Sequence, residues 1–246
     1  MRTLRYVLAG LWCLSTSVAY AQDHQVTADV DFVSRYIWRG FDLSGPKGNR
    51  PALQPAVTYS HGPSGVWVNV WGSFISGSHE NVDVPNEVDF TVGWDRFIND
   101  RFGITAGYTQ YTFPGAATGL DSHSEEIFIG LLTDNNPVNP YASLFIDFGA
   151  LEGLYFLAGV ELPVGRQMAV FPMMLDISLG FQSYDVIRDE NLKQKSGVSD
   201  INIGLSTTMG NDNVSFSPAI YWTITGFDEV NDDDEIWIKL GISFGN

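Results

Sequence analysis

Two residue patterns in this sequence could support catalytic or metal chemistry, and the first is serine beside histidine. A serine hydrolase needs its histidine within hydrogen-bond reach of the serine, and a third group that orients the imidazole ring. Adjacency in sequence does not supply that contact, and solvated loop histidines are the simpler interpretation. We therefore predict no catalytic residue. The candidates are the pairs Ser60–His61, Ser78–His79 and Ser122–His123, the last followed by Glu125 and Glu126, and the remaining histidine, His24.

The second pattern is the acidic run at residues 228–235, DEVNDDDE. Its oxygen atoms could hold a hard divalent cation, although the run lacks the alternating ligand spacing and the central glycine of an EF-hand loop. A solvated acidic loop is the simpler interpretation, and the sequence leaves divalent binding open. The chain has no glycine-rich phosphate loop and no metal-type Cys/His spacing. We predict no metal centre and no cofactor.

A third pattern combines arginines with aromatic rings in SRYIWRGFDLSG, residues 34–45. On a strand, Arg35 and Arg39 would share one face, and Tyr36 and Trp38 the other. A soluble sandwich could bury the rings in its core. A membrane barrel could instead hold the rings in the headgroup layer and the arginines in the lumen. The elements around this stretch decide between the two.

Period-two alternation of apolar and polar residues is the main signal after residue 22, and helical spacing is scarce. The polar faces carry many carboxylates, which suit a wet lumen better than a dry core. We count about twelve expected strands. The clearest apolar faces are Val26, Ala28, Val30 and Phe32; Val88, Phe90, Val92 and Trp94; Ile201, Ile203 and Leu205; and Ile236, Ile238, Leu240, Ile242 and Phe244.

The connections alternate between short and long. Short turns rich in Gly, Pro, Asn and Asp fall at 61–65, 99–101, 134–139, 163–167 and 210–213, and longer polar links lie between them, except at 149–153, where the link is short. Outer-membrane barrels sort their loops in this way, with short periplasmic turns and long external loops. We predict an all-β fold, an up-and-down antiparallel transmembrane β-barrel of about 12 strands. A soluble sandwich or lipocalin-like barrel is the alternative.

The first residues and the overall charge fit an exported barrel. Arg2 and Arg5 precede an apolar run, and Ala19-Tyr20-Ala21 resembles a cleavage site. We expect a cleaved secretory signal peptide at 1–21, a barrel domain at 22–246 and a location in the cell outer membrane. With 29 acidic and 13 basic residues, the chain has no basic surface for nucleic acid, so we expect no nucleic-acid partner.

The predicted function is a channel for passive diffusion of small polar solutes. Carboxylate-lined pores favour cations, so we expect mild cation selectivity. The expected partners are outer-membrane lipid and small polar or cationic solutes, and the oligomeric state is left open. The alternative is a plugged barrel that serves as an enzyme or as an adhesion or envelope-structure protein. Tyr36 and Trp38 are the expected interfacial aromatic residues. The expected pore-lining residues are Asp29, Asp31, Arg35, Arg39, Asp89, Asp95, Asp147, Glu161, Asp176, Asp200 and Lys239.

Three stretches between residues 30 and 75 carry a family resemblance. They are S-R-Y-I-W-R-G at 34–40, P-A-L-Q at 51–54, and the arm that contains G-V-W at 65–67 and W-G-S at 71–73. With these motifs the sequence resembles the Gcw_chp, or TorF-type, family of porin-like proteins. The resemblance implies an outer-membrane β-barrel with a channel role.

Overall fold

The structure, a computed structural model, describes residues 23–44, 50–76, 86–114, 122–134, 138–164, 172–185, 187, 190–191, 193–211 and 213–245. The predicted signal peptide therefore lies outside the described residues. Within these ranges no helix is long and apolar enough to cross a membrane. The long strands are β1 (Gln25–Val33), β4 (Ala52–His61), β5 (Val66–Ile75), β6 (Glu87–Phe97), β7 (Phe102–Thr112), β8 (His123–Thr133), β9 (Asn139–Asp147), β10 (Gly153–Val164), β11 (Met173–Tyr184), β12 (Gly197–Thr207), β14 (Val214–Thr225) and β15 (Glu235–Gly245).

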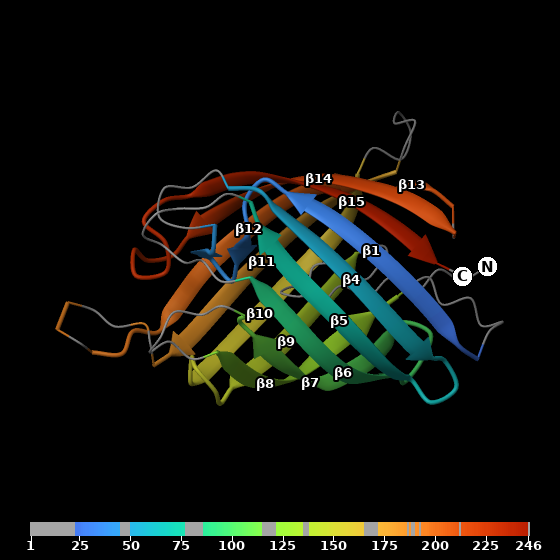
Figure 1. The fold of residues 1–246 in the computed structure, drawn as a ribbon, viewed down its shortest axis with the longest axis horizontal. Coiled ribbons are helices and arrows are strands. Elements are labelled where there is room, and N and C mark those ends of the chain that lie inside the picture. The colour runs from blue at the N-terminus through green and yellow to red at the C-terminus, as the bar shows by residue number, and fades with distance from the viewer. Residues whose placement is uncertain are drawn as a thin grey trace.

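These twelve strands form one closed antiparallel barrel (Figure 1). Each strand pairs with the next long strand in sequence, and closure comes from β1, which pairs with both β4 and β15. Closure matters because a lipid environment offers no partners to the unpaired backbone groups of a free sheet edge. Both the strand number and the up-and-down antiparallel order confirm the prediction from sequence.

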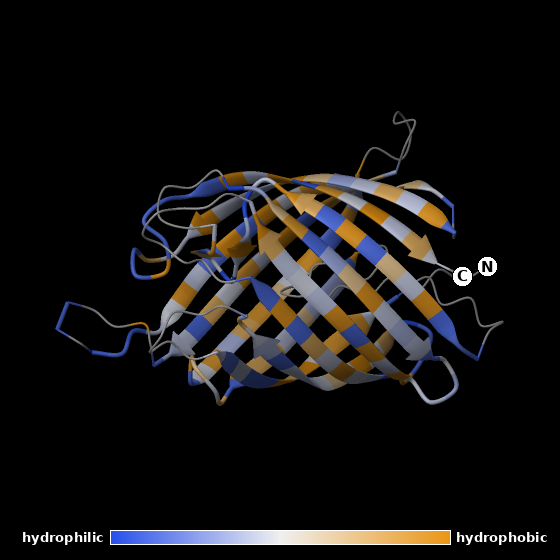
Figure 2. Cartoon of the chain, in the orientation of Figure 1, coloured by the Kyte–Doolittle hydropathy of each residue, from blue (hydrophilic) through white to orange (hydrophobic). Residues whose placement is uncertain are grey.

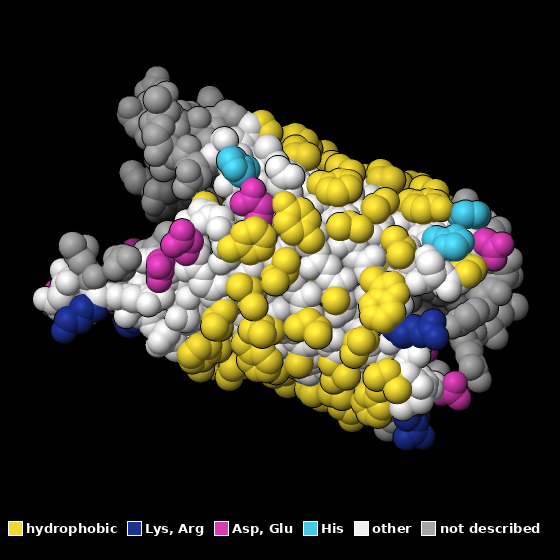
Figure 3. Space-filling model, turned by 90° about the horizontal axis from the view of Figure 1, so that it is seen from below, with side chains coloured by type: hydrophobic (Ala, Val, Ile, Leu, Met, Phe, Trp, Pro, Cys, Tyr) yellow, Lys and Arg dark blue, Asp and Glu magenta, His cyan; other side chains and the backbone are white. Residues whose placement is uncertain are grey.

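The two faces of the sheet have opposite character, as the alternating colours of Figure 2 show. On β1, Val26, Val30 and Phe32 point outward and are 44%, 36% and 41% exposed. Asp29 and Asp31 point inward and are buried. On the face of the barrel shown in Figure 3, apolar side chains cover the surface between the two ends, and charged side chains gather toward the ends. An apolar band around a closed barrel with a polar interior is the pattern of an outer-membrane protein.

Three short strands complete the described elements: β2 (Ile37–Trp38), β3 (Phe41–Asp42) and β13 (Met209–Gly210). Strand β13 extends the barrel sheet beside β14, whereas β2 and β3 pair only with each other. Both lie in the connection between β1 and β4. This connection leaves the barrel at one of its two ends, which we call the long-link end, and the opposite end is the short-turn end.

The short link at 148–152, unexpected among the long ones, is closed by Asp147. Its Oδ1 atom accepts hydrogen bonds from the backbone N–H groups of Gly149, Leu151 and Glu152, at 3.0, 3.2 and 3.1 Å. Ser124 on the neighbouring strand β8 donates to Oδ2 of the same carboxylate at 2.8 Å. Asp147 therefore organises a tight turn as well as facing the lumen.

Candidate functional site

The eight carboxylates predicted from parity all belong to inward-facing positions of the barrel strands. Asp29, Asp31, Asp89, Asp147 and Asp200 are buried. Asp95 and Asp176 accept hydrogen bonds from side chains inside the barrel, and Glu161 faces Asp176 across two paired strands. Trp67 and Thr105 donate to Asp95, Tyr141 donates to Asp176, and Glu161 lies opposite Asp176 in the register of β10 and β11.

The charges are unevenly distributed along the barrel. Arg35, Arg39 and Lys239 point inward and lie toward the long-link end, where each is within 4 Å of a carboxylate. Asp95, Glu161 and Asp176 lie toward the short-turn end, near the ends of β6, β10 and the start of β11. The lumen therefore has one end with mixed charges and one end with carboxylates.

The first strand ends earlier than the sequence pattern predicts. Strand β1 stops at Val33, and after Ser34 the chain turns into the barrel as a hairpin, residues 34–44, which contains β2 and β3. The interpretation of Tyr36 and Trp38 as interfacial aromatic residues is therefore wrong. Tyr36 is buried at 8% exposure, and Trp38 stacks on the inward-facing Tyr184. The physical reason is that these rings have apolar and aromatic partners in the lumen, so lipid contact is not their only way to leave water.

The tip of the hairpin is a two-residue turn formed by Arg39 and Gly40. Trp38 pairs with Phe41 across it, and the φ angles of Arg39 and Gly40 are 52° and 88°. Two consecutive positive φ angles define a type I′ turn, which usually takes Asn-Gly or Gly-Gly. Glycine is required at position 40, because an added Cβ would lie 2.9 Å from Cγ1 of Val230. Arginine at position 39 is unusual, since the left-handed region disfavours residues with long side chains.

Arg39 is buried against the inner wall opposite β1. Its Nη1 and Nη2 atoms donate to the two carboxylate oxygens of Glu126 at 2.6 and 2.9 Å, and Nη1 also donates to the Tyr184 hydroxyl. Both side chains of the ion pair are 1% exposed. The guanidinium carbon lies 4.3 Å from the ring centre of Phe145 and 4.7 Å from that of Tyr155. Burial alone would lower the pKa of Arg39, but Glu126 and the nearby tyrosines raise it well above its ordinary value, so the group stays charged.

Further contacts attach the rest of the hairpin. The Tyr36 hydroxyl donates to Glu87 at 2.8 Å, and burial together with Glu87 and Asp89 raises the pKa of Tyr36 well above its usual range. Arg35 forms ion pairs with Asp42 at 2.9 Å and Glu235 at 2.5 Å. These side chains attach the hairpin to β6 and β15 in addition to the Arg39 contact with β8.

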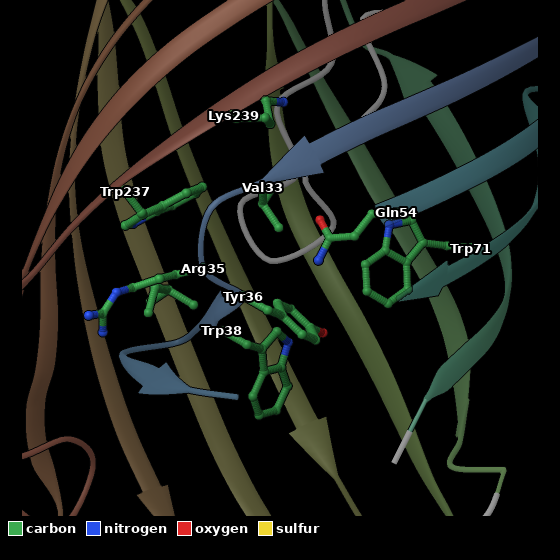
Figure 4. Close-up of a pocket in the computed structure, with 9 residues that line it drawn as sticks. Val33, Arg35, Tyr36, Trp38, Gln54, Trp71, Trp237 and Lys239 are labelled. Atoms are coloured by element: carbon green, nitrogen blue, oxygen red, sulfur yellow. The ribbon is translucent and has the colours of Figure 1, made fainter. Parts of the chain in front are cut away.

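A pocket remains between the hairpin and the strands around β1 (Figure 4). In this view Gln54 and Trp71 extend from the wall toward Tyr36 and Trp38 of the hairpin. The hairpin therefore packs against β8–β11 on one side and, through Tyr36, against Trp71 and Trp237 on the other, and the pocket between them has a volume of about 20 Å³. The lining residues are Val33, Arg35, Tyr36, Ile37, Trp38, Gln54, Trp71, Trp237 and Lys239.

The histidines show no compact catalytic arrangement within the described residues, and His79 lies outside them. His61 lies 2.8 Å from Ser64 in an exposed turn, and its ring packs against His24. At the long-link end, His123 is 3.4 Å from Ser122 and 3.7 Å from Glu125, separations longer than those of a working serine triad. Nowhere in the described part of the chain do three metal-ligating side chains meet in a geometry that could hold a metal ion.

Sequence reasoning missed the group that holds Arg39. Glu126 was considered only as a companion of His123, and Phe145, Tyr155 and Tyr184 were not singled out. The one signal that could have pointed to this site is Arg-Gly between two aromatic residues, which fits the centre of a tight hairpin turn.

Comparison with known proteins adds a family and a fold. The family profile described as "Bacterial protein of unknown function (Gcw_chp)" matches residues 18–244. No curated protein matches the sequence significantly. Among solved structures, the KdgM porin has a TM-score of 0.57 at 7% identity and covers 89% of this chain and 98% of its own. The NanC porin has a TM-score of 0.57 at 12% identity, over 88% and 98% of the two chains.

LpxR from Salmonella typhimurium has a TM-score of 0.50 at 12% identity, over 89% of this chain and 99% of its own. At these identities the likenesses show the barrel fold alone. The fold and the apolar outer band together support an outer-membrane location. Because the family profile spans nearly the whole sequence, the chain belongs to the Gcw_chp family of bacterial proteins.

Proposed function

We propose that this barrel is an outer-membrane channel for the passive diffusion of small polar solutes, with mild selectivity for cations. The observation that carries the proposal is the inner face of the closed barrel, where carboxylates and other polar side chains stand among aromatic rings, whereas the outer face is apolar. A buried row of carboxylates is costly in a dry interior but stable beside water. Porins with the same fold support this reading.

The cation preference rests on the balance of inward charges. Arg35, Arg39 and Lys239 are matched by carboxylates at the long-link end, at 2.5–3.5 Å. The carboxylates near the short-turn end have neutral donors among their partners: Trp67 and Thr105 for Asp95, and Tyr141 for Asp176. A solute therefore meets a net negative wall, which favours cations. One structural neighbour, the KdgM porin, was solved in complex with oligogalacturonate, which is acidic. In this chain the inward carboxylates favour solutes of positive charge.

The hairpin limits the size of the solutes that can pass through the lumen. Twelve strands enclose a lumen between those of eight-stranded barrels, which side chains fill, and those of 16–18-stranded porins. Here the hairpin lies within that lumen and packs against β8–β11 through Arg39 and against β5 through Tyr36, whose ring centre lies 5.7 Å from that of Trp71. We infer a narrow path past the pocket in Figure 4, whose volume of about 20 Å³ has room for about one water molecule, so that the solutes must be small and polar.

The test of selectivity is the reversal potential of the channel across a planar bilayer under a potassium chloride gradient. We expect the sign that indicates cation preference. The double variant Asp95→Asn/Asp176→Asn should reduce the preference, because it removes two inward charges. The matched control, Asp232→Asn/Asp233→Asn in the exposed loop, should change it less. A clear anion preference in the unmodified protein would contradict the proposal.

A second candidate function is a plugged barrel that acts as an enzyme or as an adhesion or envelope-structure protein. The observation that favours it is the hairpin itself, which is fixed in the lumen by buried polar contacts. This candidate predicts a folded barrel that does not conduct.

A further inference from the structure

The wall that receives Arg39 has the composition of a binding site for an organic cation. Four side chains from four neighbouring strands surround the guanidinium group, and we call them the cage: Glu126 on β8, Phe145 on β9, Tyr155 on β10 and Tyr184 on β11. A carboxylate that pairs with both ends of a planar cation, beside aromatic faces, is how proteins recognise guanidinium groups. The cage belongs entirely to the barrel wall.

The group in the cage belongs to a segment that reaches the wall through side chains and is not itself a strand of the barrel sheet. Strands β2 and β3 pair with each other and with no barrel strand. Arg39 can therefore withdraw without the loss of any backbone hydrogen bond between the wall strands. Its own backbone is strained, with φ at 52°. Strain of this kind at a non-glycine residue persists where the surrounding contacts over-determine it, and it concentrates at ligand clamps and switch regions.

Polar atoms around the cage could form further hydrogen bonds. Gln182 lies directly opposite Tyr155 in the strand register and is 0% exposed. Neither its amide nitrogen nor its amide oxygen has a hydrogen-bond partner among the described residues, and the same holds for Nε of Arg39. Buried polar atoms without partners are rare in native proteins. Such atoms beside a charged cage could serve a bound molecule that carries its own donors and acceptors.

The nearby charges also favour a cation. The Asp200 carboxylate accepts from the Tyr155 hydroxyl at 3.2 Å, immediately behind the cage, and Asp147 lies at the end of β9, two residues after Phe145. Arg39 is the one arginine or lysine that contacts the cage within the described chain. If it left, the cage would keep its aromatic faces and Glu126 would keep the neutral Tyr111 hydroxyl as a donor at 2.9 Å. Glu126 would then need another cation, because a buried carboxylate without a charged partner is costly.

We propose that the cage is a solute site for small organic cations with a guanidinium or ammonium group, and that Arg39 occupies it as a tethered competitor. The inference deepens the proposed channel function and rests on it, since it names the class of solute that dwells in the lumen. A tethered group competes at an effective concentration of about the millimolar range. A free cation therefore binds the native protein weakly and binds more tightly once Arg39 is removed.

The experiment titrates methylguanidinium chloride into the purified barrel and measures its binding by ligand-observed NMR. Methylurea, which is planar and similar in size but neutral, is the control. We expect Arg39→Ala to lower the half-saturating concentration of methylguanidinium by about tenfold or more relative to the native protein. The double variant Arg39→Ala/Glu126→Gln should lose this gain. Methylurea should bind none of the three proteins comparably.

If Arg39→Ala does not fold, Arg39→Lys carries the test. Lysine keeps the charge in the cage but lacks the two-pronged contact with Glu126, so methylguanidinium should displace it at a lower concentration than it displaces arginine. Equal half-saturation in the native and variant proteins, or equal binding of methylurea, would overturn the inference. Conductance measured on the same preparations separates the two proposals. A native barrel that conducts but whose variants bind no methylguanidinium refutes only the cage, whereas a barrel that does not conduct refutes the channel.

Discussion

Arginine placed on the outer face of β6 should destabilise the barrel in a way that depends on depth. Strand β6 runs for 11 residues from Glu87 to Phe97, and Val92 is its central residue, 37% exposed on the outer face. At about 3.4 Å per residue and a tilt of about 40°, the strand spans about 25 Å along the membrane normal. Val92 then lies near the midplane. Val92→Arg should lower the free energy of unfolding by about 2–4 kcal/mol, because the charge must leave water.

The same strand offers two controls. Ile98→Arg makes the same kind of substitution just beyond the strand, where the side chain is 72% exposed, and should cost about 0–1 kcal/mol. The native Arg96 already points outward near this end. Asp89→Asn changes a buried inner-face residue and should cost about 1 kcal/mol or less, since it removes repulsion with Glu87.

Urea unfolding in lipid vesicles, followed by tryptophan fluorescence, measures these differences. Equal costs for Val92→Arg and Ile98→Arg would show that the outer face is not immersed in lipid. If Asp89→Asn proved as damaging as Val92→Arg, a sheet buried on both faces would fit better, and the membrane assignment would fail.

Three further predictions concern the loops and the hairpin. An epitope tag at Asn191, in a long link, should be accessible on intact cells, and a tag at Ser64 only after permeabilisation; the reverse pattern would invert the topology. Glu126→Gln leaves the buried Arg39 without its carboxylate and should cost about 3–5 kcal/mol in urea unfolding, and a loss below about 1 kcal/mol would mean that the ion pair does not hold the hairpin. Gly40→Ala forces an alanine to φ of 88° and should cost about 1–2 kcal/mol in the same assay, whereas an unchanged midpoint would argue against the tight turn.

The barrel could be predicted from sequence because the residue pattern that defines each strand lies within the strand itself. Within each strand, alternating residue types identify the lipid-facing and lumen-facing sides, as Val30 and Asp31 do on β1. A shift of the strand register by one residue would turn every lipid-facing side chain toward the lumen. The turn residues between strands then give their order. Parity also identified the inward carboxylates, since that assignment needs only the strand and not its partners.

The hairpin could not be predicted in the same way. Alternation breaks for one step, where Val33 takes a polar position and Ser34 an apolar one, and it resumes with Tyr36 and Trp38. A β-bulge would give the same break, so the pattern alone does not reveal that the chain has left the sheet after Val33. The contacts that decide the matter are distant, because Arg39 meets Glu126 and Tyr184 at separations of 87 and 145 residues. Tertiary packing of this kind overrides a local pattern, and it is visible only once the strands are placed around the lumen.

Single-channel recording of the purified native protein in a planar bilayer tests the central proposal most directly. If the lumen beside the hairpin is a water-filled path, the protein should produce discrete current steps in potassium chloride. The steps should be smaller than those of 16-stranded porins recorded in the same salt, because both the strand number and the inserted hairpin narrow the path. A correctly folded barrel that inserts into the bilayer and yields no current steps would contradict the channel and favour the plugged barrel.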